Sequence, residues 1–220
     1  MTQLLALKAA WAAVVVAYLL GSVPFGLLLA KAVKGVDLRQ FGSGNIGAAN
    51  AVRAMGRKWG IFAFALDFLK GFVPVLACRW VTSDAKQLAT LQVLVGTAAV
   101  LGHCYSIYLR FHGGKGVATG CGAIVAIDPL IFLAGGCVWL ITLFTTRYVG
   151  LASILMGIAF PIAVFFRADG SERELLIGAS LLTLLILIRH RSNIQRMLAG
   201  TEPRAGEKPR ASSEIARPHG

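Results

Sequence analysis

Long apolar runs alternate with short polar segments along most of this chain, a pattern typical of a protein that crosses a membrane several times. A membrane-spanning helix needs about 20 largely apolar residues, fewer where the run is bent or incomplete. The apolar runs predict seven spans, at residues 4–33, 59–80, 87–108, 117–127, 130–146, 148–166 and 174–188. The first run contains the sequence GSVPFG, where we expect the helix to kink at the proline.

The pattern divides the chain into two parts. Residues 1–200 are predicted to form one all-α, polytopic membrane domain. Residues 201–220 are rich in Pro, Glu, Lys, Arg and Ser and are predicted to be a disordered tail.

A cleaved signal peptide is the alternative interpretation of the first apolar run, residues 4–33. The spanning helix is favoured because the run is long and no A-x-A site precedes a polar start.

The composition supports a membrane protein and sets an expectation for its partners. The chain has 220 residues, of which 56% are hydrophobic, yet its net charge is +12. A soluble protein this basic would be a candidate for nucleic-acid binding. In a chain with this much apolar sequence, cations are expected beside anionic lipid and around anionic ligands instead. We therefore expect membrane lipid, and no nucleic acid, as a partner.

The distribution of Lys and Arg predicts the orientation in the membrane. In the seven-span topology Lys70 is intramembrane, and one side collects only Lys8, Arg79, Lys86, Arg167 and Arg173. All other Lys and Arg residues fall on the opposite side. Because the cytoplasmic loops carry the excess of positive charge, the N-terminus is predicted to lie outside and the C-terminus in the cytoplasm.

Several polar or reactive side chains lie within the apolar runs. Asp67 and Lys70 stand at positions i and i+3 of one span, where charge is costly, so we expect the pair to face protein or water. A structural ion pair is favoured over a catalytic role. His103 is expected to pack or hydrogen-bond at the end of the third span, and a place in the site is the alternative. The four cysteines show no CxxC spacing and are predicted to be small buried hydrophobes rather than disulfides or metal ligands: Cys78, Cys104, Cys121 and Cys137.

A glycine-rich segment around Lys115 is the strongest candidate for chemistry. Gly113, Gly114 and Gly116 surround this lysine. Successive backbone N–H groups in such a turn can form an anion site, to which a lysine adds a positive charge. The segment is not a Walker A loop, since Val117 follows Gly116 and no Ser or Thr follows the lysine. The alternative is a tight basic turn that only sets the topology.

The predicted topology places further anion-binding and hydrogen-bonding residues on the same cytoplasmic face. These candidates are Ser43, Asn45, Asn50, Arg53, Lys115, Ser153, His190 and Asn193. Carboxylates are scarce on that face, where Asp37 is the only one outside the tail. This scarcity argues against a metal-dependent phosphotransfer site and a two-carboxylate hydrolase. Acyl transfer from an activated phosphate-bearing donor would fit, with cations stabilising the developing charge.

Three long polar motifs carry a resemblance to a known family. They read GSGNIGAANAVRAMG, GHCYSIYLRFHGGKGVATG and HRSNIQRMLAGTE, and GSVPFG and LDFLKG accompany them. The chain, apart from its tail, resembles the bacterial acyl-phosphate:glycerol-3-phosphate acyltransferase family (PlsY). The resemblance implies a seven-helix inner-membrane enzyme that transfers an acyl chain from acyl phosphate to the 1-hydroxyl of sn-glycerol 3-phosphate. The implied products are lysophosphatidate and phosphate, with no metal, coenzyme A or acyl carrier protein taking part directly.

The resemblance also implies roles for individual residues. Lys115, Arg53 and His190 are the implied catalytic residues, and His190 is either a general base or a group that orients substrate. The implied substrate-binding residues are Ser43, Arg53, Gly113, Gly114, Lys115, Gly116, Ser153, His190 and Asn193. Asn45 is a further candidate for substrate binding, and its alternative role is that of a turn or helix-cap residue. One departure is visible, because Ala49 stands where the family's first motif usually has threonine.

Two other functions are compatible with parts of the sequence. A phosphate-ester transporter would also have glycine-containing helices and a basic anion site, but it would need paired broken helices, and no inverted repeat is apparent. An acyltransferase that uses a thioester donor would be expected to have an H-x-x-x-x-D motif. Tyr108 stands five residues after His103, and Gln195 five residues after His190.

Overall fold

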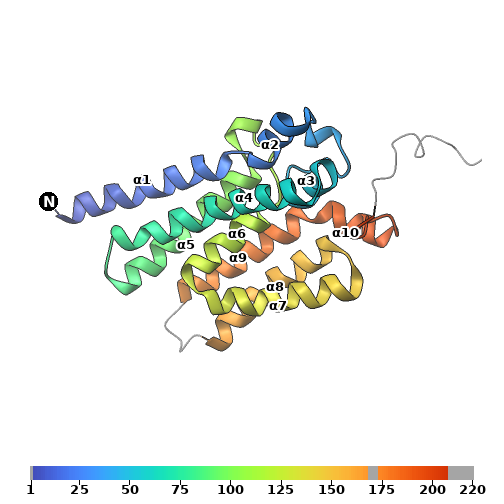
Figure 1. Cartoon of the computed structure of the whole chain (residues 1–220). Helices are drawn as coiled ribbons and strands as arrows, with labels where there is room; N and C mark the ends of the chain where they lie inside the picture. The colour runs from blue at the N-terminus through green and yellow to red at the C-terminus, as the bar shows by residue number, and fades with distance from the viewer. Residues whose placement is uncertain (1, 168–172, 208–220) are drawn as a thin grey trace, which may run out of the picture.

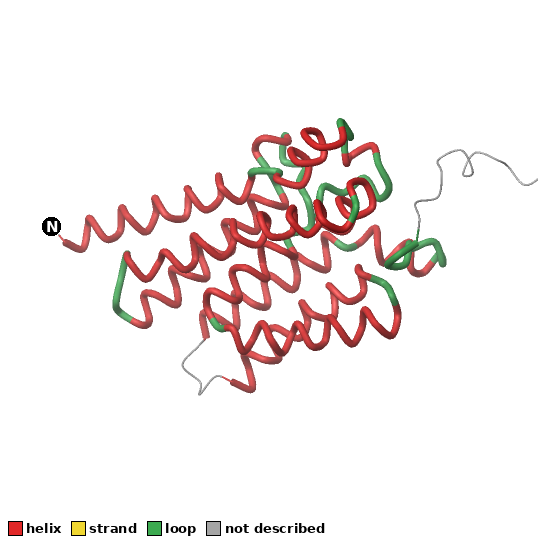
Figure 2. Tube along the Cα trace, in the orientation of Figure 1, coloured by secondary structure: helices red, strands yellow, loops and turns green. Residues whose placement is uncertain are grey.

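The computed structural model describes residues 2–167 and 173–207, which form helices joined by short turns. The long helices lie side by side in one bundle, with the described polar loops gathered at its ends (Figures 1 and 2). The helices are α1 Thr2–Ser22, α2 Phe25–Lys34, α3 Ala48–Met55, α4 Arg57–Ala77, α5 Ala85–Cys104, α6 Val117–Ile127, α7 Pro129–Thr146, α8 Val149–Arg167, α9 Arg173–Arg189 and α10 Arg191–Leu198, with short 3-10 turns η1 Leu38–Gln40, η2 Cys78–Trp80 and η3 Ile107–Leu109.

The all-α class is confirmed, and the apolar helices are of membrane-spanning type. Five helical segments are long and apolar enough to cross a membrane: Leu7–Lys34, Arg57–Trp80, Ala85–Leu109, Pro129–Thr146 and Val149–Arg167. The pair α9 and α10 adds a sixth if these helices, bent by 52°, count as one span. Helix α6 is apolar but shorter. The total of seven spans and the orientation of the termini stay predictions.

The predicted kink in the first run is present. Helix α1 ends at Ser22 and α2 begins at Phe25, with Pro24 between them. Proline cannot donate a backbone hydrogen bond, so a helix breaks there and leaves carbonyl groups without helical partners. Side chains from two other segments donate to carbonyls at this break. The Lys70 ammonium donates to the oxygen of Val23 at 2.9 Å, and the Ser106 hydroxyl donates to the oxygen of Ser22 at 2.6 Å.

The central helices pack through glycines that let two backbones approach closely. A Cβ added at Gly71 of α4 would lie 2.0 Å from the carbonyl oxygen of Thr119 in α6. A Cβ added at Gly102 of α5 would lie 2.2 Å from the carbonyl oxygen of Tyr18 in α1. Small residues at helix–helix contacts are typical of membrane proteins, because association in lipid depends on close packing. These contacts set the position of α5 and α6, the two helices that flank the glycine-rich loop.

Two sequence-based predictions about the interior are confirmed, except at Cys137. Asp67 and Lys70 form a buried ion pair with a distance of 2.8 Å between the Lys70 Nζ and Asp67 Oδ1 atoms. All four cysteines are free, and Cys78, Cys104 and Cys121 are buried as predicted. The prediction of burial is wrong for Cys137, which is exposed.

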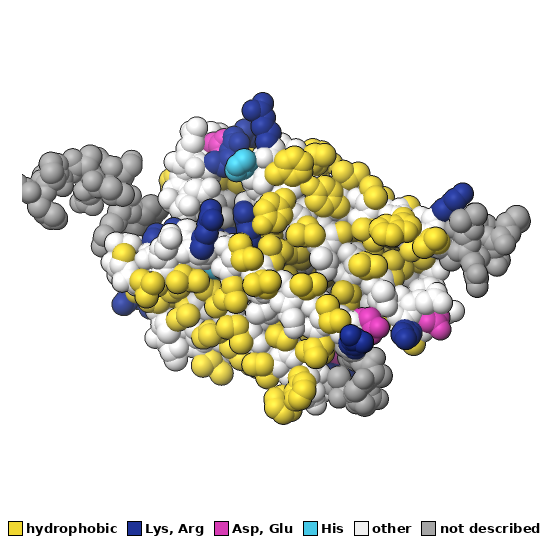
Figure 3. Space-filling model, turned by 180° about the vertical axis from the view of Figure 1, so that it is seen from behind, with side chains coloured by type: hydrophobic (Ala, Val, Ile, Leu, Met, Phe, Trp, Pro, Cys, Tyr) yellow, Lys and Arg dark blue, Asp and Glu magenta, His cyan; other side chains and the backbone are white. Residues whose placement is uncertain are grey.

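Hydrophobic and charged side chains occupy different parts of the surface. Hydrophobic side chains cover a broad band of the face seen in Figure 3, and charged side chains lie toward its two ends. The polar segments 35–56, 105–116 and 190–207 lie at the end of the bundle away from the start of α1 (Figure 1). Because these segments carry the three motifs, the fold brings the motifs to one end.

Part of the predicted tail packs against the helix bundle. Residues 201–207 belong to the described part of the chain and pack at the polar end of the bundle. The Glu202 side chain is only 8% exposed, and the backbone N–H of Ala205 donates to the carbonyl of Arg147 at 2.7 Å. Residues 201–207 therefore pack with the bundle, contrary to the disorder expected for them, and the position of the domain boundary stays a prediction. The remaining predicted tail, 208–220, lies outside the described residues.

Candidate active site

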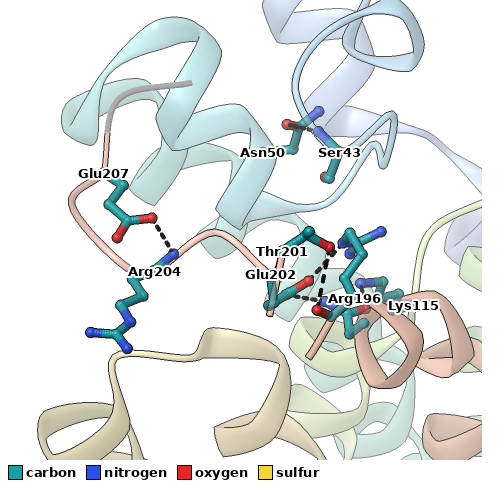
Figure 4. A network of polar contacts seen from close by, with 9 residues as sticks. Ser43, Asn50, Lys115, Arg196, Thr201, Glu202, Arg204 and Glu207 are labelled. Atoms are coloured by element: carbon teal, nitrogen blue, oxygen red, sulfur yellow. Dashed lines mark hydrogen bonds and ion pairs between the residues drawn. The ribbon is translucent and has the colours of Figure 1, made fainter. Parts of the chain in front are cut away.

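The first motif folds into a loop that Asn50 organises from the start of α3. The Asn50 amide nitrogen donates to the carbonyl oxygens of Leu38, Phe41 and Asn45 at 2.9–3.0 Å. Its side-chain oxygen accepts the backbone N–H of Ser43 at 3.1 Å (Figure 4). With an exposure of 1%, Asn50 has a structural role: it holds the loop that carries Ser43.

Asn45 and Arg53 have different positions in this segment. The Asn45 side-chain oxygen accepts the backbone N–H of Gly47 at 2.8 Å, the bond of a local turn. Arg53 lies in the last turn of α3. Burial lowers the pKa of its guanidinium, and the nearby Glu202 carboxylate opposes this effect. Arg53 therefore lies close to the third motif, whereas Asn45 shapes its own loop.

The glycine-rich loop is held against the end of α5. The N–H of Gly113 donates to the carbonyl of Cys104 at 3.1 Å, and the N–H of Gly114 donates to the carbonyl of His103 at 3.0 Å. Both donors are thus engaged within the protein. This corrects the expectation that the N–H groups of Gly113 and Gly114 cradle an anion: these glycines are needed for the close approach of the loop to α5.

The opposite side of the loop is held by Arg189, a residue that the sequence analysis did not assign to the site. Its guanidinium donates to the carbonyl of Gly114 at 3.0 Å and to the carbonyl of Gly113 at 2.8 Å. It also lies over the Tyr105 ring, 5.2 Å from the centroid. Arg189 therefore joins the C-terminal end of α9 to the loop.

The start of α6 offers the backbone donors that Gly113 and Gly114 do not. Gly116, the N-cap residue, has a φ of 78°, a left-handed conformation that favours glycine, and no side chain caps the helix. The first N–H groups of a helix have no partner within it and carry a partial positive charge. Lys115 immediately precedes this helix start. The lysine and the helix N-terminus together form an electropositive corner suited to an anion.

A polar network links the glycine-rich loop to the third motif. The Lys115 ammonium donates to the side-chain oxygen of Asn193, whose amide nitrogen donates to Glu202 Oε1 at 2.6 Å. Arg196 donates to the other carboxylate oxygen, Glu202 Oε2, at 2.7 Å. Figure 4 shows Lys115, Arg196 and Glu202 together, beside the segment that carries Thr201.

Glu202 and Arg196 were missed by the sequence analysis, although both stand in the third motif. Glu202 was counted with the tail, so the expectation that Asp37 is the only carboxylate outside the tail on this face is wrong. A buried carboxylate among cations requires partners, and Glu202 has Asn193 and Arg196. The signal for finding it was its place at the end of the motif HRSNIQRMLAGTE.

Lys115 lies in an unusually cationic and enclosed environment. Burial lowers its pKa from 10.5 to about 8, and the positive charges of Arg196, Arg53 and Arg189 act in the same direction. The Glu202 carboxylate acts in the opposite direction. An anionic ligand would relieve this repulsion, and so the charge distribution favours anion binding at this point.

His190 lies between α9 and α10 with an exposure of 2%. Its Nδ1 atom lies 2.8 Å from the carbonyl oxygen of Ile186, which assigns the ring proton to Nδ1. The Nε2 atom is then the ring nitrogen that can accept a hydrogen bond or a proton. The side chain is held in place by its own helix.

The hydrogen bonds of Ser153 are made to residues of α7 and α8, outside the polar network around Lys115. Its hydroxyl donates to the carbonyl of Val149 at 2.9 Å and accepts the indole N–H of Trp139 at 3.4 Å. One turn earlier in α8, Gly150 packs directly on Asn193, since a Cβ there would lie 2.7 Å from the Asn193 Nδ2 atom. Helix α8 therefore borders the site, with Ser153 one turn away from the contact.

Comparison with known proteins gives a consistent result. The family model described as glycerol-3-phosphate acyltransferase matches residues 11–200. Glycerol-3-phosphate acyltransferases from Trichlorobacter lovleyi and Aquifex aeolicus are 45% and 46% identical to this chain; the matches cover 84% and 87% of this chain and 92% and 96% of the relatives.

Solved structures show the same relationship. The glycerol 3-phosphate form of PlsY, an integral membrane glycerol 3-phosphate acyltransferase, has a TM-score of 0.83 and 43% identity, over 94% of this chain and 98% of that chain. The lysophosphatidic acid form has a TM-score of 0.80 and 42% identity, over 90% and 96% of the two chains. The all-α fold, the grouping of three motifs at one end of the bundle and these matches over most of the chain show that it belongs to the PlsY family of glycerol-3-phosphate acyltransferases, and that it is a multi-pass membrane enzyme.

Proposed function

We propose that this enzyme transfers an acyl chain from acyl phosphate to the 1-hydroxyl of sn-glycerol 3-phosphate. The hydroxyl oxygen attacks the carbonyl carbon of the mixed anhydride, the bond between that carbon and the phosphate oxygen breaks, and lysophosphatidate and phosphate are formed. The observation that carries the proposal is the enclosed cationic cluster around Lys115 at the polar end of an apolar bundle. The similar structure in a lysophosphatidic acid form supports the product.

The cluster has the charge that two phosphate-bearing substrates require. Lys115, Arg53 and Arg196 lie near one another, and the start of α6 adds uncapped N–H groups. We assign Lys115 to a phosphate group and to the negative charge that develops on the carbonyl and leaving oxygens in the transition state. Arg53 is assigned to the glycerol phosphate, because a guanidinium can bind phosphate through two parallel hydrogen bonds.

The hydroxyl proton has two possible acceptors. The Nε2 atom of His190 is one, because Nδ1 is engaged with Ile186. The departing phosphate is the other. We favour the phosphate as acceptor and assign His190 to orienting the hydroxyl, since the donor is already activated and needs no strong base. Either route conserves the proton: it leaves the hydroxyl and ends on phosphate or solvent.

The remaining polar residues are assigned to position the substrates. Ser43 is placed by Asn50 and is proposed to contact glycerol phosphate. Asn193 is proposed to hold Lys115 in the direction of the phosphate. Gly116 is proposed to expose the backbone at the start of α6. Ser153 is proposed to act from α8, and Asn45 through the turn that it stabilises.

The cellular setting follows from the charge distribution. We propose that the motif-bearing end faces the cytoplasm and that the bundle lies in the bacterial inner membrane. In the predicted topology, the side that carries the three motifs also carries most of the Lys and Arg residues. That end is expected to stay on the cytoplasmic side of a bacterial membrane.

The deciding experiment measures phosphate release from palmitoyl phosphate by the purified enzyme in lipid, with and without glycerol 3-phosphate. We expect release that depends on glycerol 3-phosphate, yields lysophosphatidate in equal amount, and is unaffected by EDTA. Parallel reactions use palmitoyl-coenzyme A as donor. Turnover with the thioester but none with palmitoyl phosphate would overturn the proposed donor, and inhibition by EDTA would overturn the metal-independent step.

A further inference from the structure

A second group of ionisable side chains lies below the cationic cluster, inside the helix bundle. Asp67 and Lys70 of α4 are each 2% exposed, and His103 near the end of α5 is 4% exposed. Charged groups at such depth are costly and point to a specific role. The ion pair and the bond from Lys70 to Val23 account for Lys70. These two interactions do not explain the role of the His103 side chain.

His103 contacts the glycine-rich loop through both its main chain and its side chain. Its carbonyl oxygen accepts the Gly114 N–H at 3.0 Å. Its ring lies directly against the same residue, since a Cβ added at Gly114 would lie 2.2 Å from the Nε2 atom. The imidazole thus occupies the space that any larger residue at 114 would need, and it forms the surface on which the loop rests.

The other edge of the imidazole faces the ion pair. The Nδ1 atom lies 3.7 Å from Asp67 Oδ1 and has no hydrogen-bond partner among the described residues. Asp67 is itself held by Lys70 at 2.8 Å. The ring therefore stands between the ion pair on one side and Gly114 on the other, and the carboxylate defines which edge of the ring faces the loop.

We propose that His103, oriented by Asp67, is a positioning residue that sets the backbone of Gly113 and Gly114 and thereby the direction of Lys115. Arg189 binds the carbonyls of the same two glycines from the opposite side. The loop is therefore clamped between α5 and α9, and its next residue is the lysine proposed to bind phosphate. This inference rests on the proposed function of Lys115, not on the identity of the acyl donor.

The test compares His103→Ala, His103→Gln and Asp67→Asn with the unchanged enzyme. We measure the dissociation constant for glycerol 3-phosphate from the ligand-dependent rise in Tm, together with kcat and KM. We expect His103→Ala to weaken binding and lower kcat/KM by about 10- to 100-fold, the scale on which small misplacements act. Glutamine, which retains a polar group of similar reach, is expected to restore part of this loss.

A matched control lies in the same helix. Gln92 is a buried polar residue of α5, remote from the loop, with an exposure of 6%. Gln92→Ala is expected to lower Tm while leaving the glycerol 3-phosphate dissociation constant within about twofold. If His103→Ala behaves like this control, with a lower Tm and unchanged affinity, the residue is merely structural and the proposal is wrong.

A double substitution separates the orientation by Asp67 from independent effects. If Asp67 acts through the imidazole, His103→Ala combined with Asp67→Asn loses little more affinity than His103→Ala alone. Fully additive losses would contradict the coupling. Failure of the unchanged enzyme to use palmitoyl phosphate would overturn the proposed donor, but the glycerol 3-phosphate affinities would still decide the role of His103.

Discussion

Lys115 donates a hydrogen bond to the side-chain oxygen of Asn193, which lies 78 positions later in the sequence. Asn193 in turn donates to Glu202, so one neutral amide separates the lysine from a buried carboxylate. A direct contact between Lys115 and Glu202 would neutralise the lysine and weaken its attraction for phosphate. The amide holds the two charges apart while satisfying both.

Asn193→Asp is therefore expected to be more harmful than Asn193→Ala. The aspartate would pair with Lys115 and add negative charge beside Glu202, whereas alanine removes only the hydrogen bonds. We expect KM for glycerol 3-phosphate to rise in both variants, with at least a tenfold larger loss of kcat/KM for aspartate, equivalent to about 1.4 kcal/mol. Steady-state kinetics on monodisperse protein checks the order, and equal losses would contradict the role of the amide as a spacer.

Lys115→Ala is expected to lower kcat/KM by about 10²–10³-fold. This is the usual cost of removing one hydrogen-bond donor to the negative charge that develops in a transition state. The matched control is Lys86→Ala, which removes an exposed lysine from the start of α5 at the other end of the helix. The control should retain full activity. Near-normal turnover of the Lys115 variant, with an unchanged Tm, would exclude Lys115 from the phosphate site.

The pH dependence of binding should report the titration of Lys115. Its pKa is lowered to about 8, chiefly by burial, so the free enzyme loses this positive charge as the pH rises through 8. The phosphate of the ligand is already doubly charged there, because its second pKa is about 6. We expect KM for glycerol 3-phosphate to rise between pH 7.5 and about 9, and Lys115→Met to lack this inflection.

The lowered pKa of Lys115 also predicts how the free energy of unfolding of the ligand-free enzyme depends on pH. Between pH 8 and 10.5 the unfolded chain retains the lysine proton while the folded chain releases it. The unfolded state then binds more protons, so the contribution of this group to the free energy of unfolding rises with pH across that window. Comparing the Tm of the ligand-free enzyme with that of Lys115→Met measures this contribution. We expect the Tm of the unchanged enzyme, minus that of Lys115→Met, to rise as the pH goes from 8 to 10. A difference that stays constant or falls over this range would contradict a lowered pKa.

Gly116→Ala should disrupt the loop, whereas Gly136→Ala should be tolerated. Gly116 has a φ of 78° and a Cβ there would lie 2.8 Å from a Val100 methyl group, but a Cβ at Gly136 of α7 has open space. We expect the first change to lower the free energy of unfolding by about 1–3 kcal/mol and to abolish most activity. The second should stabilise α7 by about 0.5–1 kcal/mol without affecting activity. Thermal unfolding and kinetics of both variants provide the comparison.

Asn50→Ala tests whether the first motif depends on one buried amide. The change removes the bonds to three carbonyl groups and to the Ser43 N–H. Leaving such buried groups without partners costs about 1–3 kcal/mol. We expect a lower Tm together with a higher KM for glycerol 3-phosphate. Ser43→Ala should raise KM without lowering Tm, so the two variants separate loop integrity from substrate contact.

Much of the fold follows from local sequence. The apolar run at 117–127 coincides with α6, and the proline in GSVPFG separates α1 from α2. These features depend on hydrophobicity and on the missing N–H group of proline, both of which are local properties. The short helices α3 and α10 were not predicted, because each has 8 residues and no continuous apolar run.

The sequence predicted which residues belong to the candidate site, but not the contacts that they make. The motifs identified Lys115, Arg53, His190 and Asn193 as a group, and the fold brings their segments to one end of the bundle. The sequence could not indicate that the N–H groups of Gly113 and Gly114 are already bonded to α5. Such bonds depend on which carbonyls lie nearby in space, a property that only helix packing defines.

By itself, then, the sequence determined the helical class, the helix breaks and the chemistry of the anion-binding side chains, because hydrophobic patterning and residue chemistry act locally. The tertiary structure alone decided that Glu202 belongs to the site rather than to a tail, that Arg189 and His103 hold the loop from opposite sides, and that Asn193 separates Lys115 from a carboxylate. Each of these depends on contacts between residues distant in the chain, which form only when α5, α6 and α9 pack together.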